Sequence, residues 1–365
     1  MRILHIHPAM RGGGIEAMIC ALANEMSKTD SVTVCSIFEP THSDVFWNKL
    51  SPDVRKCSLG KTRPGFSLKE IFSVLGLIRR GRFDVVNMHG MFVYYLLSVF
   101  LLHSRTKFFY TVHSDAVMEN SRWDRRILAV KRFCFRKQWV HPIVISNASQ
   151  DSFRKLYCCG SILIHNGIAR QDVVASEVVS EYRFSPQTVV FIHAGRIDTP
   201  KNQLVLCKVF KHLIAEGEDV VLLIAGAKQG SDIYDSIEPY FCDRIVYLGE
   251  RSDVPQLMAA SDAMCLPSLW EGLPVTLLES IAVGCVPICS DVGGISDVIV
   301  SGENGILSES PSEEDYCSSV RRFLAMSSAD RLRMSRNCME SFGRFDIANA
   351  SRAYIDAYKS VGKGL

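Results

Sequence analysis

The stretch RILHIHPAMRGGGIEAMICALANEM, residues 2–26, decides how the N-terminal part of this chain folds. Residues 2–7 predict a short buried strand, and residues 8–14 form a loop that ends in three consecutive glycines. Apolar residues then recur at helical spacing, at Ile15, Met18, Ile19, Leu22 and Met26. A strand, a glycine-rich loop and a helix in this order indicate the first unit of a parallel α/β sheet.

The alternation of strands and helices continues along the chain. Further strands are predicted at 32–38, 85–89, 108–113, 142–146 and 162–165, and helices at 68–80 and 92–102. Residues 168–187 are polar and lose periodicity, which predicts a linker. After it, strands are predicted at 189–194, 220–225, 245–248, 263–267 and 286–290, and helices at 202–216, 254–260, 274–283 and 313–325. The pattern predicts two doubly wound α/β domains in tandem.

Length and composition agree with two folded domains. The chain has 365 residues, of which 47% are hydrophobic and 22% charged, and this composition excludes a disordered or low-complexity protein. We expect an N-terminal domain at 1–170, a linker at 171–187, a C-terminal domain at 188–345 and a final helix at 346–365 that crosses back to the first domain, with a cleft between the domains. The thirteen cysteines lack zinc spacing, and no signal peptide precedes the first strand, so we expect a cytoplasmic protein.

The charge of the chain is divided unevenly between its halves. Residues 1–180 carry 24 Lys/Arg and 14 Asp/Glu, and residues 181–365 carry 17 and 25, so the halves have formal charges of +10 and −8. The basic half suits an anionic partner, either nucleic acid or a membrane surface. No nucleic-acid module is recognisable in the sequence, which favours the membrane.

The segment Arg122–Lys137 is the most basic part of that half. On a helix, its cations Arg122, Arg125, Arg126, Arg132, Arg136 and Lys137 fall in one stripe that includes Phe133. Such a face suits anionic lipid, although a solvated basic face is an equal alternative. The apolar run Met91–Leu102 is too short to span a bilayer and predicts a buried helix.

Three motifs carry candidate chemistry. Gly12–Gly14 precede a helix, whose N-terminus favours a phosphate. Arg196 and Lys201 follow a strand, where two cations can converge on a diphosphate. Glu271 and Glu279 flank a helix start and could hold sugar hydroxyls. Taken one at a time, each motif also has a plain structural explanation: a flexible turn, two solvated cations and a surface glutamate pair.

Together the motifs resemble those of family 4 glycosyltransferases, the retaining group with the two-Rossmann GT-B fold. The resemblance covers nearly the whole chain. It rests on the glycine loop with Glu16, His113, Ser146, the segment 164–168, Arg196 with Lys201, the pair Glu271 and Glu279, and the segment 290–294.

The resemblance implies a role for each matching residue. Arg196 and Lys201 neutralise the diphosphate leaving group, Glu271 contacts the donor sugar, and Glu279 contacts the ribose. The donor-binding set is Gly13, Gly14, Arg196, Lys201, Gly249, Glu250, Glu271, Gly272, Leu273, Pro274, Val275 and Glu279. The catalytic set is His113, Arg196, Lys201 and Glu271, and the acceptor side has Glu16, His113 and Ser146. No cofactor or metal is expected, because the chain lacks an Asp-x-Asp motif.

The resemblance also implies an activity. We expect a retaining transferase that moves a sugar from a nucleotide-diphosphate donor, UDP-sugar first, to a hydroxyl of a lipid-linked oligosaccharide. The setting would be O-antigen, capsule or exopolysaccharide biosynthesis, at the cytoplasmic face of the inner membrane. The alternatives are a GT-B phosphorylase, a nucleotide-sugar epimerase and a non-catalytic sugar-nucleotide-binding protein.

Overall fold

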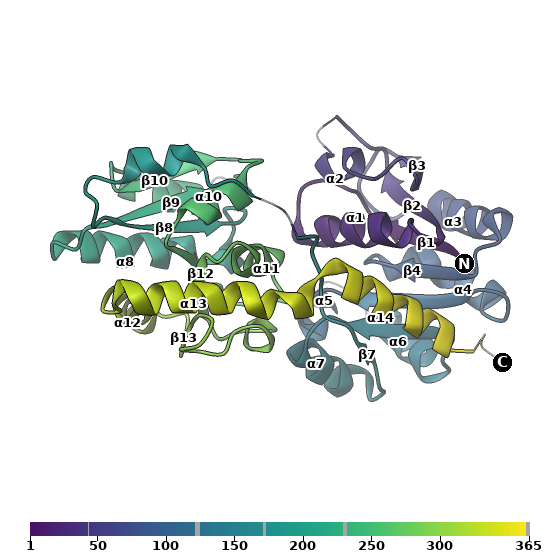
Figure 1. The fold of residues 1–365 in the computed structure, drawn as a ribbon. Coiled ribbons are helices and arrows are strands. Elements are labelled where there is room, and N and C mark those ends of the chain that lie inside the picture. Colours follow the sequence, from purple (N-terminus) through teal and green to yellow (C-terminus); the bar gives the residue numbers. More distant parts are fainter. Residues whose placement is uncertain (43, 121–124, 171–172, 229–231, 363–365) are drawn as a thin grey trace. The chain divides into compact units, whose positions relative to one another are not determined.

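The computed structural model describes residues 1–365 except 43, 121–124, 171–172, 229–231 and 363–365. The chain forms two compact units, one of Met1–Ala169 with Phe345–Leu365 and one of Arg170–Arg344 (Figure 1). Each unit is built on a sheet whose described strands pair in parallel. The predicted fold class, two Rossmann-like α/β domains, is confirmed.

The sheet of the first unit has the strand order β3-β2-β1-β4-β5-β6-β7. Its strands are β1 (Arg2–His7), β2 (Ser31–Phe38), β3 (Arg55–Lys61), β4 (Val85–Met88), β5 (Lys107–Val112), β6 (Val140–Val144) and β7 (Ile162–Leu163). Its helices are α1 (Gly14–Met26), α2 (Val45–Asn48), α3 (Leu68–Gly81), α4 (Leu96–Leu102), α5 (Ala116–Asn120), α6 (Arg125–Arg136), α7 (Asn147–Tyr157) and α14 (Ile347–Ser360). The strand order reverses between β1 and β4, which makes the carboxyl ends of these strands a favoured ligand position.

Alternate residues of each strand feed two cores, one on each face of this sheet. Leu4 and Val86 belong to the core that α3, α6 and α7 cover. Ile3 and Val85 belong to the core that α1 and α14 cover. The last helix, α14, therefore completes the first unit, and the hydroxyl of its Tyr358 accepts a hydrogen bond from the amide of Asn87 on β4 at 2.9 Å.

The sheet of the second unit has the strand order β10-β9-β8-β11-β12-β13 and reverses between β8 and β11. Its strands are β8 (Val189–Ala194), β9 (Val220–Ala225), β10 (Ile245–Gly249), β11 (Ala263–Leu266), β12 (Val286–Ser290) and β13 (Ile306–Ser308). Its helices are α8 (Gln203–Ala215), α9 (Asp232–Ile237), α10 (Val254–Ala260), α11 (Val275–Ala282), α12 (Glu313–Leu324) and α13 (Ser328–Ser341). Every residue of β8 and β9 is buried, so helices or loops cover both faces.

Two segments that the sequence analysis described have a different structure from the one predicted. The apolar run predicted as a buried helix is a 3₁₀ turn, η1 (Phe92–Tyr95), followed by α4, and it is only partly buried because Phe100 and Leu101 are exposed. The segment predicted as an aperiodic linker contains a 3₁₀ helix, η2 (Glu177–Tyr182), whose Val179 is buried. The helix expected over Arg122–Lys137 is α6, and Arg122 lies outside the described residues.

Candidate functional site

In the second unit, the predicted cations and Glu271 lie where the strand order reverses. Arg196 and Lys201 follow β8, and Glu271 follows the neighbouring strand β11. The carboxyl ends of adjacent parallel strands share one edge of the sheet, so this is the position where α/β folds bind ligands. Arg196 is exposed, while Lys201 and Glu271 are partly buried.

Lys201 and Glu271 form a direct ion pair. The Lys201 Nζ lies 2.7 Å from the Glu271 Oε1, and only 19% of the Lys201 side chain and 10% of the Glu271 side chain are exposed. The hydroxyl of Ser268 donates a second hydrogen bond to the same carboxylate oxygen at 2.6 Å. Because both charges are largely shielded from water, the Coulombic attraction between them is less screened than in a surface salt bridge. The structure thus brings two of the predicted site residues into contact.

Buried polar side chains beneath this pair hold the loop after β8, and sequence reasoning missed them. The His193 Nδ1 donates to the carbonyl of Cys265 on β11 at 2.9 Å, so its Nε2 accepts from the Gln203 amide at 3.2 Å. The same amide donates to the Arg196 carbonyl at 2.7 Å. Burial lowers the pKa of His193 to about 4, which keeps the ring neutral. A lone histidine within an apolar strand was the available signal.

The loop that carries Glu271 packs against the backbone of Gly293. Gly293 has a φ of +61°, and a Cβ built on it would lie 2.1 Å from the Glu271 carbonyl oxygen. The amide of Gly294 donates to the carbonyl of Gly272 at 2.7 Å. These contacts require glycine at position 293 and fix the approach of the chain to α11. They explain why the double glycine after β12 belongs to the same site as Glu271.

The other predicted donor residues lie along the same sheet edge. Leu273, Pro274 and Val275 are buried at the start of α11, so only their backbone could meet a ligand, and Glu279 lies about one turn into that helix. Gly249 is the last residue of the edge strand β10, two strands away from β8, and Glu250 follows it. The carbonyl of Gly249 accepts from the amide of Gly226 at 2.8 Å.

In the first unit, His113 is part of a histidine cluster at the carboxyl edge of the sheet. The His5 Nδ1 lies 3.1 Å from the His89 Nε2, and the His89 Nδ1 lies 2.9 Å from the His113 Nε2. The His7 Nδ1 donates to the His89 carbonyl at 3.1 Å, and its Nε2 lies 3.5 Å from the Glu16 Oε1. The cluster therefore connects two of the predicted residues, His113 and Glu16, through His89 and His7, which sequence reasoning did not select.

A buried ionic group lies beside His113. The backbone of His113 hydrogen-bonds to the carboxylate of Glu119, which also accepts a short hydrogen bond from Tyr110. The Lys131 Nζ lies 4.0 Å from the Glu119 Oε1 and donates to the Tyr110 hydroxyl at 3.4 Å. Burial raises the pKa of Glu119 and lowers that of Lys131. This group holds the end of β5 and thereby the position of His113.

Ser146, predicted on the acceptor side, is the residue that caps the N-terminus of α7. It is fully buried, and its hydroxyl oxygen accepts from the Ser149 amide at 3.1 Å as the N-cap of α7. Its hydroxyl donates to the Ser149 Oγ at 2.8 Å. Gly13 is the N-cap position of α1, and Gly14 is its first residue, so the predicted glycine loop does open a helix.

The comparisons with known proteins match nearly the whole chain. Residues 12–172 match the model of the Glycosyltransferase Family 4, and residues 177–340 match that of the Glycosyl transferases group 1. The chain belongs to glycosyltransferase family 4.

Several known proteins are similar to this family 4 glycosyltransferase. It is 26% identical to the UDP-Gal:α-D-GlcNAc-diphosphoundecaprenol α-1,3-galactosyltransferase of Escherichia coli, over 57% of the chain but only 52% of that enzyme. It is 22% identical to an uncharacterised 41.2 kDa protein in the cps region of Klebsiella pneumoniae, over 84% of the chain and 86% of the relative. The Anabaena protein Alr3699/HepE, solved in complex with UDP and glucose, is 17% identical with a TM-score of 0.80 and covers 99% of the chain and 100% of its own. The last likeness supports the GT-B fold.

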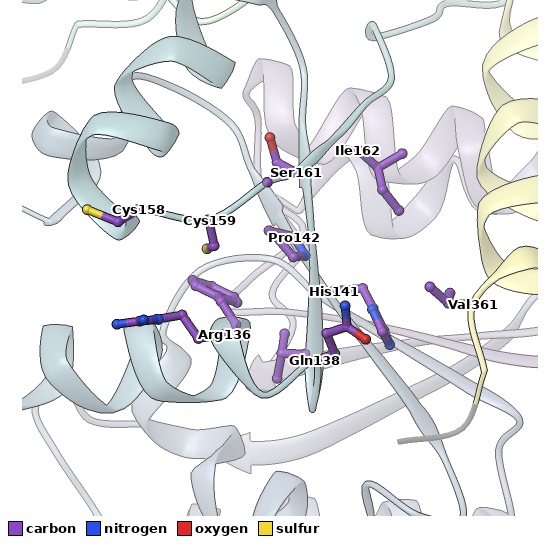
Figure 2. A pocket seen from close by; sticks show the side chains of 12 residues that line it. Arg136, Gln138, His141, Pro142, Cys158, Cys159, Ser161, Ile162 and Val361 are labelled. Atoms are coloured by element: carbon purple, nitrogen blue, oxygen red, sulfur yellow. The ribbon is translucent and has the colours of Figure 1, made fainter. Parts of the chain in front are cut away.

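The family 4 glycosyltransferase also has a hollow that none of the predicted site residues lines. Its volume is about 470 Å³. Figure 2 shows that its side chains come from the ends of α6 and α7, from the starts of β6 and β7, and from Val361, which follows α14. Strand starts lie at the amino edge of a parallel sheet, so this hollow and the histidine cluster occupy opposite edges.

In the described part of the chain, no group of three or more His, Cys, Asp or Glu side chains is arranged for a metal ion.

Proposed function

We propose that this chain transfers a sugar from a nucleotide-diphosphate donor to a hydroxyl acceptor, with retention of the anomeric configuration. The observation that carries the proposal is the shielded Lys201–Glu271 pair beside Arg196 at the point where strand order reverses. The names of the E. coli relative and of the Anabaena structure support a UDP-sugar as the donor.

Each predicted site residue of the second unit has a part in the proposed reaction. Arg196 and Lys201 bind the diphosphate and stabilise the charge that develops on it as the glycosidic phosphate bond breaks. These two cations supply the positive charge for the leaving group, so we propose that no metal or cofactor is needed. Glu271 holds Lys201 and binds a hydroxyl of the donor sugar. Glu279 binds the ribose, and Gly249 with Glu250 lies near the base.

The first unit binds the acceptor side of the reaction. Glu16 and His113 lie at the carboxyl edge of its sheet with the Gly13–Gly14 loop, whose amides face a phosphate or sugar oxygen. The acceptor oxygen forms a bond to the anomeric carbon as the phosphate oxygen leaves on the same face, and that departing oxygen takes the acceptor proton. We assign Ser146 the capping of α7 in place of the contact to the acceptor, because its hydroxyl is buried and engaged.

We further propose that the acceptor is lipid-linked and that the chain docks on an anionic membrane, in surface polysaccharide synthesis at the cytoplasmic face. The name of the E. coli relative contains a diphosphoundecaprenol acceptor, which supports this. Within the described residues, no helix is both long enough and apolar enough to span a bilayer.

The outer side of α6 suits docking on such a membrane. Arg125, Arg126 and Arg136 are exposed there, and so is 43% of Phe133. Lys131, by contrast, points into the core and pairs with Glu119.

A second exposed aromatic ring, that of Phe100, lies near Phe133. Phe133 packs edge to face against Trp139 at 5.2 Å between ring centroids, and Trp139 also contacts Phe100, which is 44% exposed. Aromatic rings flanked by arginines match the interface of an anionic bilayer.

Nucleotide release tests the transfer reaction. The protein would be incubated with UDP-sugars, with and without a diphosphoundecaprenol-linked sugar. Lys201→Ala and Glu271→Ala should each lower the turnover by about 10²- to 10³-fold. The first removes a cation that stabilises the leaving group, and the second removes the partner that holds Lys201 and binds the sugar hydroxyl. The matched control is Lys208→Ala, because Lys208 forms an exposed pair with Glu313 at 3.8 Å and should keep full activity. Near-normal turnover of either site variant contradicts the proposal. Nucleotide release that does not depend on the acceptor also contradicts it and favours a hydrolase.

Liposome binding tests the membrane contact. The protein should bind vesicles with phosphatidylglycerol and not neutral vesicles at low salt, and Phe133→Ser should weaken the binding. Leu332→Ser is the control, because Leu332 is 59% exposed on α13 of the second unit. Equal binding to neutral vesicles, or equal loss in both variants, would contradict docking through α6.

A further inference from the structure

The histidine cluster contains a chain of three rings that leads from the core to the sheet edge. His5 lies on β1, His89 directly follows β4 in the loop after it, and His113 follows β5, and these three strands are neighbours in the sheet. His5 and His89 are fully buried, whereas His113 is partly exposed. Only the last ring of the chain can therefore meet a ligand.

The hydrogen bonds of the chain allow two arrangements of protons on neutral rings. In the first, the His5 Nδ1 donates to the His89 Nε2, and the His89 Nδ1 donates to the His113 Nε2. In the second, both bonds run in the opposite direction, and the proton of His5 lies on Nε2. A neutral imidazole has one donor and one acceptor, so no mixed arrangement satisfies both bonds.

The buried end of the chain distinguishes the two arrangements. Among the described residues, the His5 Nε2 has no hydrogen-bond partner. The second arrangement would bury an N–H group there without an acceptor, whereas the first leaves only a lone pair. Orphaned buried N–H groups are the rarer and costlier case, so the first arrangement is favoured. In it, His113 accepts at Nε2 and carries its proton on Nδ1.

We propose that His5 and His89 are positioning residues that hold His113 as a neutral Nδ1–H imidazole, so that His113 donates a hydrogen bond to a substrate oxygen and does not act as a general base. The proposal rests on the proposed transferase function for the identity of that substrate. With Nε2 occupied by His89 and Nδ1 protonated, neither nitrogen of His113 has a lone pair for the acceptor proton. The acceptor proton must then go to the departing phosphate oxygen.

Other contacts keep the rings in this arrangement. The backbone amide of His89 donates to the Ile6 carbonyl at 2.9 Å, and its carbonyl accepts from His7, so the backbone of His89 is fixed at both groups. Burial lowers the pKa of His5 to about 4 and that of His113, with His7 nearby, to about 3. The rings therefore stay neutral at physiological pH.

The experiment is a measurement of histidine tautomers by long-range ¹H–¹⁵N correlation on the full-length, ¹⁵N-labelled protein without substrate. The His113 signal is assigned by its loss in His113→Asn. We expect the proton of His113 on Nδ1, with no detectable Nε2–H form. Protonation of His113 on Nε2 in the wild-type protein overturns the proposal, whatever the activity of the protein is.

Three variants test whether His89 determines the tautomer of His113. His89→Phe removes the donor to His113 and should yield a mixture of tautomers. His89→Asn places an amide N–H close to the position of Nδ1 and should restore the Nδ1–H form. The control is His212→Phe, an exposed histidine of α8, which should leave the signal unchanged. If His113 has the same tautomer in His89→Phe as in the wild type, His89 does not position His113 and the proposal is contradicted.

Kinetics connect the tautomer with turnover. His89→Phe should lower kcat by about 10- to 100-fold, a typical effect of losing an orienting partner, while KM for the UDP-sugar stays within about 2-fold. His89→Asn should recover most of that kcat. An unchanged kcat in His89→Phe with a changed tautomer would show that His113 has no part in turnover. If the wild type turns over no UDP-sugar, the transferase function fails, while the tautomer measurement still decides the inference.

Discussion

Replacing Gly293 by alanine should lower the stability of the protein by more than the ordinary cost of placing alanine at a positive φ. The additional cost comes from the Glu271 loop, which packs against this position. The new Cβ would lie 2.1 Å from the Glu271 carbonyl oxygen and 2.8 Å from its carbonyl carbon. Both are backbone atoms, so relief requires a shift of the loop by more than about 1 Å. Such overpacking costs about 1–3 kcal/mol, in addition to about 1–2 kcal/mol for alanine at positive φ.

Gly302→Ala supplies the control, because Gly302 has a φ of +89° and nothing within 4 Å of an added Cβ. Urea unfolding should show Gly293→Ala to be less stable than Gly302→Ala by about 1–3 kcal/mol, or about 2–12 °C in Tm for a unit of this size. Gly293→Ala should also bind UDP more weakly, because the shift moves Glu271 away from Lys201. Equal stability of the two variants, or full UDP affinity of Gly293→Ala, would refute the argument.

Three further outcomes follow from the contacts of other residues. Ser146→Ala should lower the free energy of unfolding by about 1 kcal/mol through loss of the α7 cap, with UDP affinity unchanged in a binding assay. Tyr358→Phe should cost about 1–3 kcal/mol in urea unfolding, because the buried Asn87 amide loses its acceptor; an unchanged midpoint would contradict this. Burial holds the pKa of His141 at about 4, below its ordinary value of 6.5, so the unfolded state binds the proton first as the pH falls. Its share of stability is complete above pH 6.5 and is lost toward about pH 4, by about 1.4 kcal/mol per pH unit, and His141→Gln should flatten the pH dependence of unfolding by that slope.

The sequence predicted the parts of the fold that depend on local periodicity. Buried parallel strands are continuous apolar runs, so β1, β8 and β12 were placed almost to the residue. The edge strand β3 was not predicted because it begins with two consecutive exposed cations, Arg55 and Lys56, and has only exposed or partly buried residues after them until Lys61. The helix α7 has only scattered apolar residues and was missed for the same reason.

The candidate site was predictable where its residues follow strands in the sequence. Arg196 and Lys201 were selected because they follow a predicted strand, and Glu271 because it precedes a predicted helix start. The direct contact of Lys201 with Glu271 was found only in the structure. The hydrogen-bonded rings of His5, His89 and His113 were not predictable as a group. His5 and His89 are 84 residues apart and become neighbours only through strand order. A single sequence indicates which residues end strands but not which strands are adjacent.

The position of α14 has a consequence for the order in which the chain folds during synthesis. The second unit, Arg170–Arg344, is continuous and is complete in sequence before α14 leaves the ribosome. The first unit begins earlier but ends later, because Tyr354 and Tyr358 belong to one of its two cores. Until they arrive, the side of its sheet that bears Ile3 and Phe109 lacks part of its cover and is open to wrong partners. The domain that starts first on the ribosome is thus the one that finishes last.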